Sequence, residues 1–466
     1  MARDLSSKFG LNVEVRSIEH IPACERRGKA WHLAPFWFTG NFVLTTMATG
    51  FIGPVSGLQA WQAILAIVLG VMVGTLCMAL HANQGPRLGL AQMIQSRAQF
   101  GLYGAVFPLM AVIGIYIGFN VFNLTLASEI LSPLLPGSAA LWQGVLLAVA
   151  LLIAMVGHDL LHTLQRWLTY VLIAVFGWLT ITALGHLEFD TAQPWLPFSW
   201  AAFFGQLSVA AAYQFSYAVY VSDYSRYLPE DTPAHRVIGW TYLGAAASAI
   251  WLMSLGALLA SALPADGPTG YLKHLGDLAL PGFGTVATLV ALPALVGIMA
   301  INCYGAMLSG ASALSALGAV KPGARSRILG IAVIGVIIYL ATLSLPNTYL
   351  ENFSLFLQLL LYFLLPWSAI NLTDFYLLRK GRYVTCEFFN KHGIYGRWSL
   401  PGIVSYTWAL LAMLPFASLG SYQGWMVAGF GEVDLAGPIG FLCAAVLYAG
   451  LAPQRRTTLL AQEDGQ

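Results

Sequence analysis

Long runs of apolar residues alternate with short polar segments along almost the whole chain. A helix that crosses the hydrocarbon core of a bilayer needs about 20 consecutive apolar residues, and most of these runs have that length. Glycine, proline and charged residues separate them, and the pattern predicts twelve spanning helices at residues 33–57, 60–80, 103–131, 139–157, 167–186, 200–221, 237–262, 284–316, 328–345, 350–373, 400–420 and 435–452. We therefore expect an all-α polytopic membrane protein.

No long polar stretch interrupts the series, so a single membrane domain is expected. The pattern places this domain at 31–453, between a polar N-terminal segment at 1–30 and a polar tail at 454–466. Residues 1–30 have no apolar core of the kind that a secretory signal requires. Because the predicted number of spans is even, both termini are expected on the same side of the membrane.

Composition supports a membrane protein and excludes several other classes. Hydrophobic residues make up 58% of the 466 residues and charged ones only 9%, whereas about a quarter of a soluble globular protein is charged. A disordered chain and a nucleic-acid-binding protein are therefore excluded as descriptions of the whole chain. The five cysteines are scattered without a C-x-x-C pair, which is typical of small buried residues rather than of a metal or redox site.

The distribution of Lys and Arg predicts an orientation. If the N-terminus is cytoplasmic, all of the 22 Lys and Arg residues except Lys273 fall in cytoplasmic segments. Basic residues are preferentially retained on the cytoplasmic side of a membrane. We therefore predict a multi-pass protein of the cell's inner membrane with both termini in the cytoplasm.

Two of the predicted spans contain residues that interrupt helices. The first span holds Gly40-Asn41 and Gly53-Pro54, and the sixth carries glycine, glutamine and serine among its tyrosines. Interruptions at matching positions of two halves are typical of inverted-repeat transporters, where they lie at the binding site. The spacing predicts repeats at about 31–186 and 200–373, followed by extra helices at about 400–453. Tight packing of helices through small residues is the alternative interpretation.

Polar segments of the chain are similar to those of a known transporter family. They are GPRLGLAQMIQSRAQFG (85–101), SDYSRYLP (222–229) and AINLTDFYLLRKGRY (369–383). Together they resemble the nucleobase–cation symporter-1 family. The first of them and the N-terminal IPACERRGKAWHLAPFWFTGN (21–41) most resemble its purine–cytosine permease branch. The resemblance is collinear over about 18–385.

This resemblance implies a fold and an activity. The fold is a five-plus-five inverted repeat with discontinuous helices 1 and 6, followed by two C-terminal helices. The activity is secondary active transport, in which a small planar nitrogen heterocycle, such as cytosine, a purine or a related compound, is imported by cation symport with alternating access. The partners implied are that heterocycle, H⁺ or Na⁺ and the lipid bilayer, and we expect a monomer.

In that family the substrate lies between helices 1, 3, 6 and 8, and the resemblance implies contacts in this chain. Tyr116 falls at an aromatic position that stacks on the substrate, and Asn120 falls one turn later at an amide position. Residues four apart share one helix face, so one helix can supply both contacts. On helix 6 the aromatic and polar contacts fall near Tyr213, Gln214 and Tyr217, and the sequence does not choose the stacking ring among them.

Helix 8 is predicted to add an amide to the same site. Asn302 lies in the Asn-x-Tyr element of this helix, and its alternative role is a hydrogen bond between helices. Asn123 is the alternative to Asn120 if the register differs by one turn. Tyr116 departs from the family, which usually has Trp there, and its alternative role is packing or anchoring at the membrane interface.

The coupling ion is predicted from another departure. Sodium-coupled relatives hold Na⁺ between helix-1 carbonyls and Ser/Thr hydroxyls of helix 8, where this chain has Val296 and Gly297. Carbonyls near Gly40 and Asn41 would remain as ligands, but hard cations require several oxygens. H⁺ is therefore favoured over Na⁺, and no other cofactor or metal is expected. Acidic groups in or near spans are often functional, and the candidate proton carriers are Glu129, Asp159 and Asp374.

Other functional classes have weaker support. A symporter of the same fold could carry an amino acid or an amine instead. A channel would need a filter-like loop or a charged ring, and none is apparent in the sequence. His158 and His162 have the spacing of two zinc ligands on one helix face, but Asp159 replaces the usual Glu and no third ligand is apparent. We therefore do not expect an enzyme.

Overall fold

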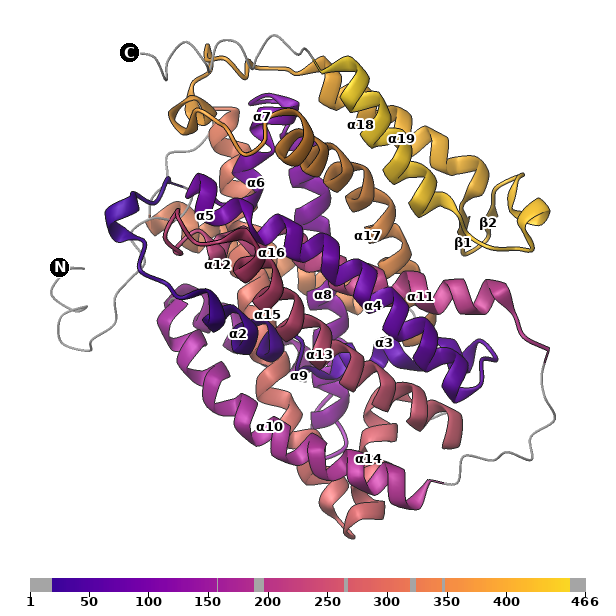
Figure 1. Cartoon of the computed structure of the whole chain (residues 1–466). Coiled ribbons are helices and arrows are strands. Elements are labelled where there is room, and N and C mark those ends of the chain that lie inside the picture. The colour runs from indigo at the N-terminus through magenta and orange to yellow at the C-terminus, as the bar shows by residue number, and fades with distance from the viewer. Residues whose placement is uncertain are drawn as a thin grey trace, which may run out of the picture.

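The structure is a computed structural model of the chain, and it describes residues 19–156, 158–187, 197–263, 267–318, 324–345 and 348–452. Only the backbone is described at residues 156, 158–167 and 324–325. Helices occur in every range that the apolar runs predict, and they run roughly side by side in one bundle (Figure 1). A helix satisfies its own backbone hydrogen bonds, which is what an apolar environment requires.

The predicted first repeat contains α2 (Leu33–Gly40), α3 (Leu44–Val55), α4 (Ala60–Ala82), α8 (Val106–Leu131), α9 (Ala139–Val156) and α10 (His158–His186). The predicted second repeat contains α11 (Trp200–Phe215), η3 (Ser216–Val219), α12 (Val221–Ser225), α13 (Ala234–Ala262), α15 (Phe283–Ala316), α16 (Ala324–Leu343), α17 (Tyr349–Leu372) and the π-helix η4 (Thr373–Leu378). The helices at the C-terminal end are α18 (Leu400–Met413) and α19 (Ala436–Leu451).

Short elements occupy the connections. They are η1 (Ala23–Glu25), η2 (Ala30–His32), α5 (Gln84–Leu88), α6 (Gln92–Gln95), α7 (Arg97–Phe100), α14 (Gly267–Ala279), η5 (Thr385–Phe389), η6 (Leu414–Phe416), β1 (Ser418–Leu419), β2 (Tyr422–Gln423) and η7 (Val427–Phe430). The two strands pair antiparallel as a small hairpin.

Among the described residues, seven helices are long and apolar enough to cross a membrane, and four shorter apolar helices accompany them. The chain is therefore a multi-pass membrane protein, and the count of twelve spans stays a prediction. The domain limits also stay predictions, because 1–18 and the tail at 454–466 lie outside the described residues.

Both predicted interruptions are present, and they lie at nearly the same depth in the bundle. The first comes after Gly40, where Val43 adopts an extended conformation before α3 begins. The second comes after Phe215, where a 3₁₀ turn replaces the α-helix until α12 begins. Pro54 lies in the last turn of α3 and does not interrupt that helix. The helix breaks are therefore at 41–43 and 216–220, beside each other in the fold.

The bundle consists of two groups of helices with the breaks between them. Helices α3, α4, α11 and α13 pack against one another, and α8, α9, α15 and α16 form the second group. Small residues allow close approach within the first group. A Cβ at Gly50 would lie 1.9 Å from the Met253 carbonyl oxygen, and one at Gly74 would lie 2.3 Å from the Ala211 carbonyl oxygen.

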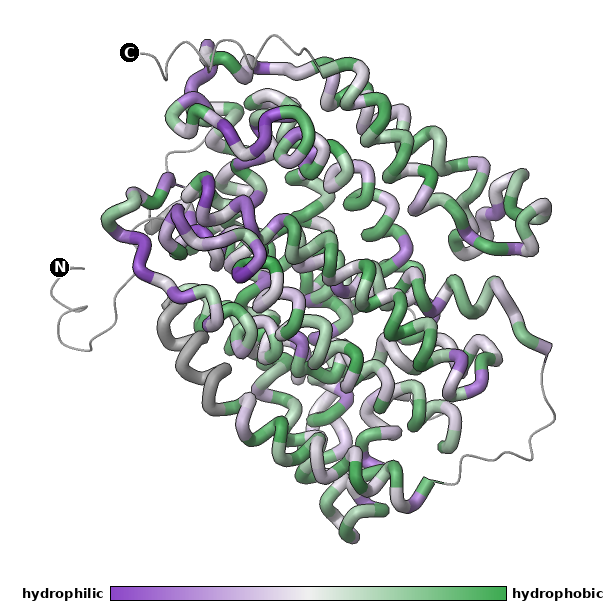
Figure 2. The backbone as a smooth tube through the Cα atoms, viewed as in Figure 1, coloured by the Kyte–Doolittle hydropathy of each residue, from purple (hydrophilic) through white to green (hydrophobic). Residues whose placement is uncertain are grey.

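Apolar side chains cover the outside of the bundle, as a lipid environment requires. Large exposed residues include Val73 on α4, Ile181 on α10 and Val446 on α19, a pattern that a water-soluble surface rarely shows. Polar residues gather at the end of the bundle that contains α5 and α12 (Figure 2). We call this the basic end, because its loops and short helices carry Arg26, Arg87, Arg97, Arg226 and Arg379.

Helix α14 was not expected from the sequence. Its side chains Tyr271, Leu272 and Leu275 are buried, whereas Lys273 and Asp277 are exposed. Since polar residues occupy one whole face, its average hydropathy is low and it resembles a loop in a search for spanning helices.

Candidate substrate-binding site

A small cavity lies between the two groups of helices, beside both helix breaks. Its volume is about 20 Å³, which is room for about one water molecule. The structure is therefore closed around this point. The lining residues come from α3, α8, α15 and the broken sixth span, and they are Thr45, Ile115, Tyr116, Phe119, Asn123, Tyr213, Ser216, Tyr217, Tyr220, Ile298 and Asn302.

A pair of tyrosine rings separates this cavity from a second one. Tyr116 and Tyr220 have ring centroids 5.7 Å apart at an interplanar angle of 34°, and both rings line both cavities. A Cβ at Gly305 would lie 2.7 Å from Cζ of Tyr116, so this glycine leaves room for the ring. The second cavity extends toward the basic end, where Asp223 and Arg226 line it. The tyrosine pair is thus a thin partition.

Asn302 lines the cavity, as the resemblance implies, and Asn120 lies behind it. Asn302 Nδ2 donates to Asn120 Oδ1 at 3.0 Å, and Asn120 Nδ2 donates to the Met299 carbonyl at 3.0 Å. Asn120 therefore orients the amide of Asn302. Asn123, the alternative of a different register, lines the cavity itself, and its buried Oδ1 accepts no hydrogen bond from the described residues.

On the sixth span, Tyr213 and Tyr217 face the cavity and Gln214 does not. The hydroxyl of Tyr213 accepts a hydrogen bond from Thr46 Oγ1 at 2.8 Å, and Tyr217 donates its own to the Gly40 carbonyl at 3.2 Å. Tyr213 and Tyr217 are four residues apart and share one face of the helix, whereas Gln214 follows Tyr213 directly and points from another face. The two tyrosines therefore connect the sixth span to the first by hydrogen bonds at the edge of the cavity.

Gln214 and Asn41 instead connect the two helix breaks outside the cavity lining. Gln214 Nε2 donates to Asn41 Oδ1 at 3.0 Å, and Thr75 Oγ1 donates to Gln214 Oε1 at 3.3 Å. Asn41 Nδ2 also donates to the Ala245 carbonyl at 3.0 Å. Both side chains are fully buried, and their amides satisfy each other rather than face the cavity.

The predicted cation region offers few free oxygens. The Gly40 carbonyl accepts from Tyr217, and the Asn41 carbonyl accepts from the Val43 amide at 2.9 Å. On α15, Val296 and Gly297 bring no side-chain oxygen. The described residues contain no group of three or more His, Cys, Asp or Glu that could hold a metal ion, and the side chains of His158, Asp159 and His162 lie outside the described residues.

Neither Glu129 nor Asp374 lines the cavity. Glu129 accepts a hydrogen bond from Thr269 at 3.2 Å. Asp374 forms a salt bridge with Arg379 at 2.9 Å and accepts from Gln99 and Tyr383, each at 2.8 Å. These contacts favour a structural role for Asp374.

A second polar region, which we call the polar clasp, joins α4, the following loop and α17. It consists of His81, Gln84, Gln92, Gln99, Ser368, Asn371 and Asp374. The His81 ring stacks on Trp367 with centroids 4.8 Å apart and hydrogen-bonds Ser368 at 2.8 Å. Gln84 donates to Asn371 at 2.6 Å. No residue of the clasp lines the cavity, so the loop that carries the family resemblance holds helices together.

Arg97 of the same loop connects this region to α15 by hydrogen bonds. Its guanidinium donates to the carbonyls of Ser312, near the end of α15, and Phe388, at 3.2 and 3.3 Å. Burial lowers the pKa of Arg97 to about 10, so the group is charged at neutral pH. A cation at this point compensates the carbonyls of a helix C-terminus.

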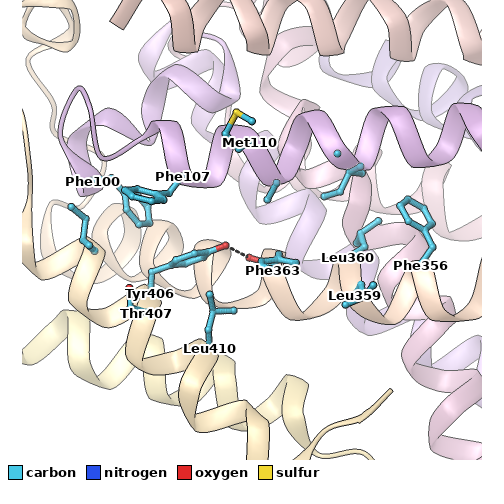
Figure 3. Close-up of a pocket in the computed structure, with 14 residues that line it drawn as sticks. Phe100, Phe107, Met110, Phe356, Leu359, Leu360, Phe363, Tyr406, Thr407 and Leu410 are labelled. Carbon is cyan, nitrogen blue, oxygen red and sulfur yellow. Dashed lines mark hydrogen bonds between the residues drawn. The ribbon is translucent and has the colours of Figure 1, made fainter. Parts of the chain in front are cut away.

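A larger and mostly apolar hollow lies elsewhere in the bundle and has little chemistry for a polar substrate. It lies between α8, α17 and α18, has a volume of about 560 Å³ and contains no charged side chain (Figure 3). The hydroxyl of Tyr406 in this hollow donates to the Phe363 carbonyl at 3.1 Å, while Phe107 and Met110 are exposed on the outside. A polar heterocycle would lose its hydrogen bonds in such a place. The hollow therefore faces lipid, although Ile115 lines both it and the central cavity.

Sequence reasoning missed some of these positions. Tyr220 and Asn123 both line the cavity, but the sequence assigns no contact to Tyr220 and offers Asn123 only as an alternative. A signal for Tyr220 existed: it follows Tyr217 by three residues, and such residues share a face in a 3₁₀ turn.

Comparisons with known proteins agree with this arrangement. A family profile described as "permease for cytosine/purines, uracil, thiamine, allantoin" matches residues 20–440. The putative purine-cytosine permease YxlA of Bacillus subtilis is 38% identical, over 96% of this chain and 97% of that protein. The purine-cytosine permease FCY2 of Saccharomyces cerevisiae is 26% identical, over 95% of this chain and 86% of that protein.

A solved structure shares the fold. It is Mhp1, a nucleobase-cation-symport-1 family transporter, in a closed conformation with bromovinylhydantoin bound. Its TM-score is 0.74 at 18% sequence identity, over 97% of this chain and 96% of that chain. With the inverted-repeat fold, the broken helices and a family match across nearly the whole length, the chain belongs to the nucleobase–cation symporter-1 family and is a membrane transporter, not an enzyme.

Proposed function

We propose that the chain imports a nucleobase such as cytosine or a purine, or a related planar nitrogen heterocycle, by cation symport with alternating access. The observation that carries this proposal is the cavity beside the two helix breaks, which combines buried tyrosine rings with amide groups. Its relatives include permeases named for purines and cytosine. Another relative is named a vitamin B6 transporter, so we include related heterocycles beside the nucleobases in the proposed substrate class.

The chemistry of the lining matches a flat ring with a polar edge. Tyrosine faces stack on aromatic rings, and Tyr116, Tyr217 and Tyr220 surround the cavity. A carboxamide has both donors and an acceptor, which complements the adjacent N–H and C=O or ring nitrogen of a nucleobase. Asn302 and Asn123 supply these groups, and Asn120 holds Asn302 in place.

Alternating access requires the closed cavity to open on either side in turn. The Tyr116–Tyr220 partition lies between the cavity and the second cavity, which extends toward the basic end. Separation of these rings, as the two groups of helices move apart, would join the two cavities and release substrate toward that end. We place the basic end in the cytoplasm of the cell, on the inner side of the membrane, because its described loops and short helices carry Arg26, Arg87, Arg97, Arg226 and Arg379.

We propose H⁺ as the coupling ion. The Gly40 and Asn41 carbonyls already accept hydrogen bonds, and Val296 and Gly297 add no oxygen. A Na⁺ site would need several oxygen ligands, whereas proton coupling needs one titratable group. Of the proposed carriers, Glu129 is favoured over Asp374, because Asp374 is held in a salt bridge. Transport by a single protomer is part of the same proposal.

Uptake by proteoliposomes tests the function directly. Purified protein should accumulate radiolabelled cytosine or a purine, and unlabelled nucleobases should compete. A panel of amino acids and amines should not compete at the same concentrations. Competition by an amino acid, with none by any nucleobase or related heterocycle, would replace the proposal with a symporter of another class.

A further inference from the structure

The basic end contains a second hollow that the transport cycle described above does not use. Its volume is about 600 Å³, far larger than the closed substrate cavity, and the two share no lining residue. It lies where the end of α4 meets the turn after η4. Its lining residues are Asn83, Arg87, Glu230, Phe375, Tyr376, Lys380, Gly381 and Arg382.

The rim of this hollow is positively charged. Arg87, Lys380 and Arg382 are exposed, and within the described chain none of the three forms an ion pair. The single acid of the lining, Glu230, lies 4.0 Å from Nη1 of Arg26, which is outside the hollow. The rim thus presents more positive than negative charge to whatever enters it.

The backbone brings two of these cations together. Lys380 has φ of 51° and Gly381 has φ of 76°, so the chain reverses tightly just after η4. A left-handed conformation costs a residue with a side chain more than it costs glycine. The reversal places Lys380 and Arg382 in the same lining as Arg87 of α5.

The floor of the hollow is aromatic and includes a buried amide. Phe375 and Tyr376 line it. Asn83, which is 5% exposed, donates to the Tyr376 hydroxyl at 3.3 Å. Its Oδ1 accepts no hydrogen bond from the described residues. A buried acceptor of this kind is normally satisfied by a partner or a ligand.

We propose that this hollow binds an organic phosphate, with the phosphate on Arg87, Lys380 and Arg382 and the organic part against Phe375 and Tyr376. Arginine and lysine are the usual side chains for phosphate. Two sources carry this chemistry at the basic end: a free nucleotide in the aqueous phase, and the headgroup of an anionic phospholipid. The ligand would bridge α5 and the turn after η4.

Binding to purified protein tests the proposal without any transport step, so its result is independent of the proposed function. In phosphatidylcholine nanodiscs, titration calorimetry with a purine nucleoside monophosphate should give saturable binding that inorganic phosphate displaces. The triple variant Arg87→Gln, Lys380→Gln, Arg382→Gln should bind about tenfold more weakly or worse, because three charge-assisted contacts are lost.

A matched control separates this site from general attraction to the basic end. The triple variant Arg27→Gln, Arg236→Gln, Lys391→Gln removes the same charge from exposed positions outside the lining, and it should bind like the wild type. Glu230→Gln should change affinity in the opposite direction and tighten binding, since it removes the one acid from the rim.

Anionic lipid provides the second arm. If the nucleotide does not bind, nanodiscs containing phosphatidylglycerol should raise the unfolding temperature of the wild type and of the control variant (Arg27→Gln, Arg236→Gln, Lys391→Gln). They should not raise that of the pocket variant (Arg87→Gln, Lys380→Gln, Arg382→Gln). That result assigns the site to a lipid headgroup. If the pocket variant and the control behave alike with nucleotide and with lipid, the proposal is wrong.

Discussion

The two buried polar regions of the molecule, the substrate cavity and the polar clasp, have different designs. The clasp joins its residues by hydrogen bonds of 2.6–3.4 Å between different elements, such as Gln84 to Asn371 at 2.6 Å and Asn371 to Gln99 at 3.4 Å. Gln92 Oε1 of the clasp and Asn123 Oδ1 of the cavity both lack a partner in the described chain. Asn123, however, lines a small open space between tyrosine rings, and no residue of the clasp lines that space. The clasp is suited to hold helices, and the cavity keeps polar groups available for a ligand.

This difference shows that a segment with a strong family resemblance need not line the proposed substrate cavity. The loop at 85–101 carries the most specific resemblance, yet its glutamines lie in or near the clasp and none lines the cavity. A hydrogen bond connects the clasp with the second cavity: the backbone amide of Gln92 donates to Asp223 Oδ1 at 2.7 Å, and Asp223 lines the second cavity. Substitutions in the two regions should therefore separate substrate binding from stability.

The largest effect on transport is expected from Asn302→Ala. The substrate edge loses its amide partner and Asn120 loses the group that it orients, so saturable uptake should be abolished while the protein still reaches the membrane. Uptake kinetics and the amount of protein in the membrane are the measurements. Asn352→Ala, a polar residue of α17 outside the cavity lining, is the control and should transport normally. Wild-type affinity in Asn302→Ala would remove this residue from the site.

The largest effect on stability is expected in the clasp. Asp374→Asn leaves the buried Arg379 without its counter-ion, and breaking a buried pair costs about 3–5 kcal/mol. The unfolding temperature in detergent should fall clearly, while the affinity for substrate in the remaining folded protein should change less than about twofold. A large loss of affinity with unchanged unfolding temperature would contradict the division between clasp and cavity.

Substitutions at Tyr116 test stacking. Tyr116→Phe keeps the ring and should retain most of the binding, whereas Tyr116→Leu should weaken it by the 0.5–1.5 kcal/mol or so that aromatic pairing adds beyond buried area. Dissociation constants from the binding of labelled substrate provide the comparison. Equal affinities for the two variants would mean that Tyr116 packs against Tyr220 without stacking on the substrate.

Tyr220→Ala tests the partition. Removing this ring would connect the cavity with the second cavity, so a cysteine reagent applied from the basic side should reach a cysteine introduced at Ser216 several times faster than in a protein with Tyr220. Labelling rates measured on a cysteine-free background give the result, and Tyr220→Phe is the matched control. Equal rates in Tyr220→Ala and Tyr220→Phe would place the barrier elsewhere.

The smallest expected effect is that of sodium. Uptake should be driven by an imposed gradient with the outside acidic, because protons then flow inward with the substrate. Replacing Na⁺ with choline at fixed pH should change the rate little. If proteoliposomes require Na⁺ at fixed pH, other oxygens near Gly40 and Asn41 complete a cation site.

The positions of the helices and both helix breaks could be predicted from the sequence. Apolar runs of spanning length form helices because only internal hydrogen bonds satisfy a backbone in lipid. Glycine, asparagine and serine interrupt such runs where the backbone lines a cavity. The same argument failed for α14, because a helix with one polar face has the average hydropathy of a loop.

Which side chains meet in the cavity was decided by the tertiary structure. The sequence by itself determined that Tyr213 and Tyr217 share a face, since an α-helix repeats every 3.6 residues. It did not determine that the chain changes to a 3₁₀ turn at Ser216, which brings Tyr220 onto the same face as Tyr217. The sequence resemblance implies Asn120 at the amide position with Asn123 as the alternative, whereas Asn123 lines the cavity. One turn of register changes which amide faces the cavity, and only the packing of α8 against α15 sets that register.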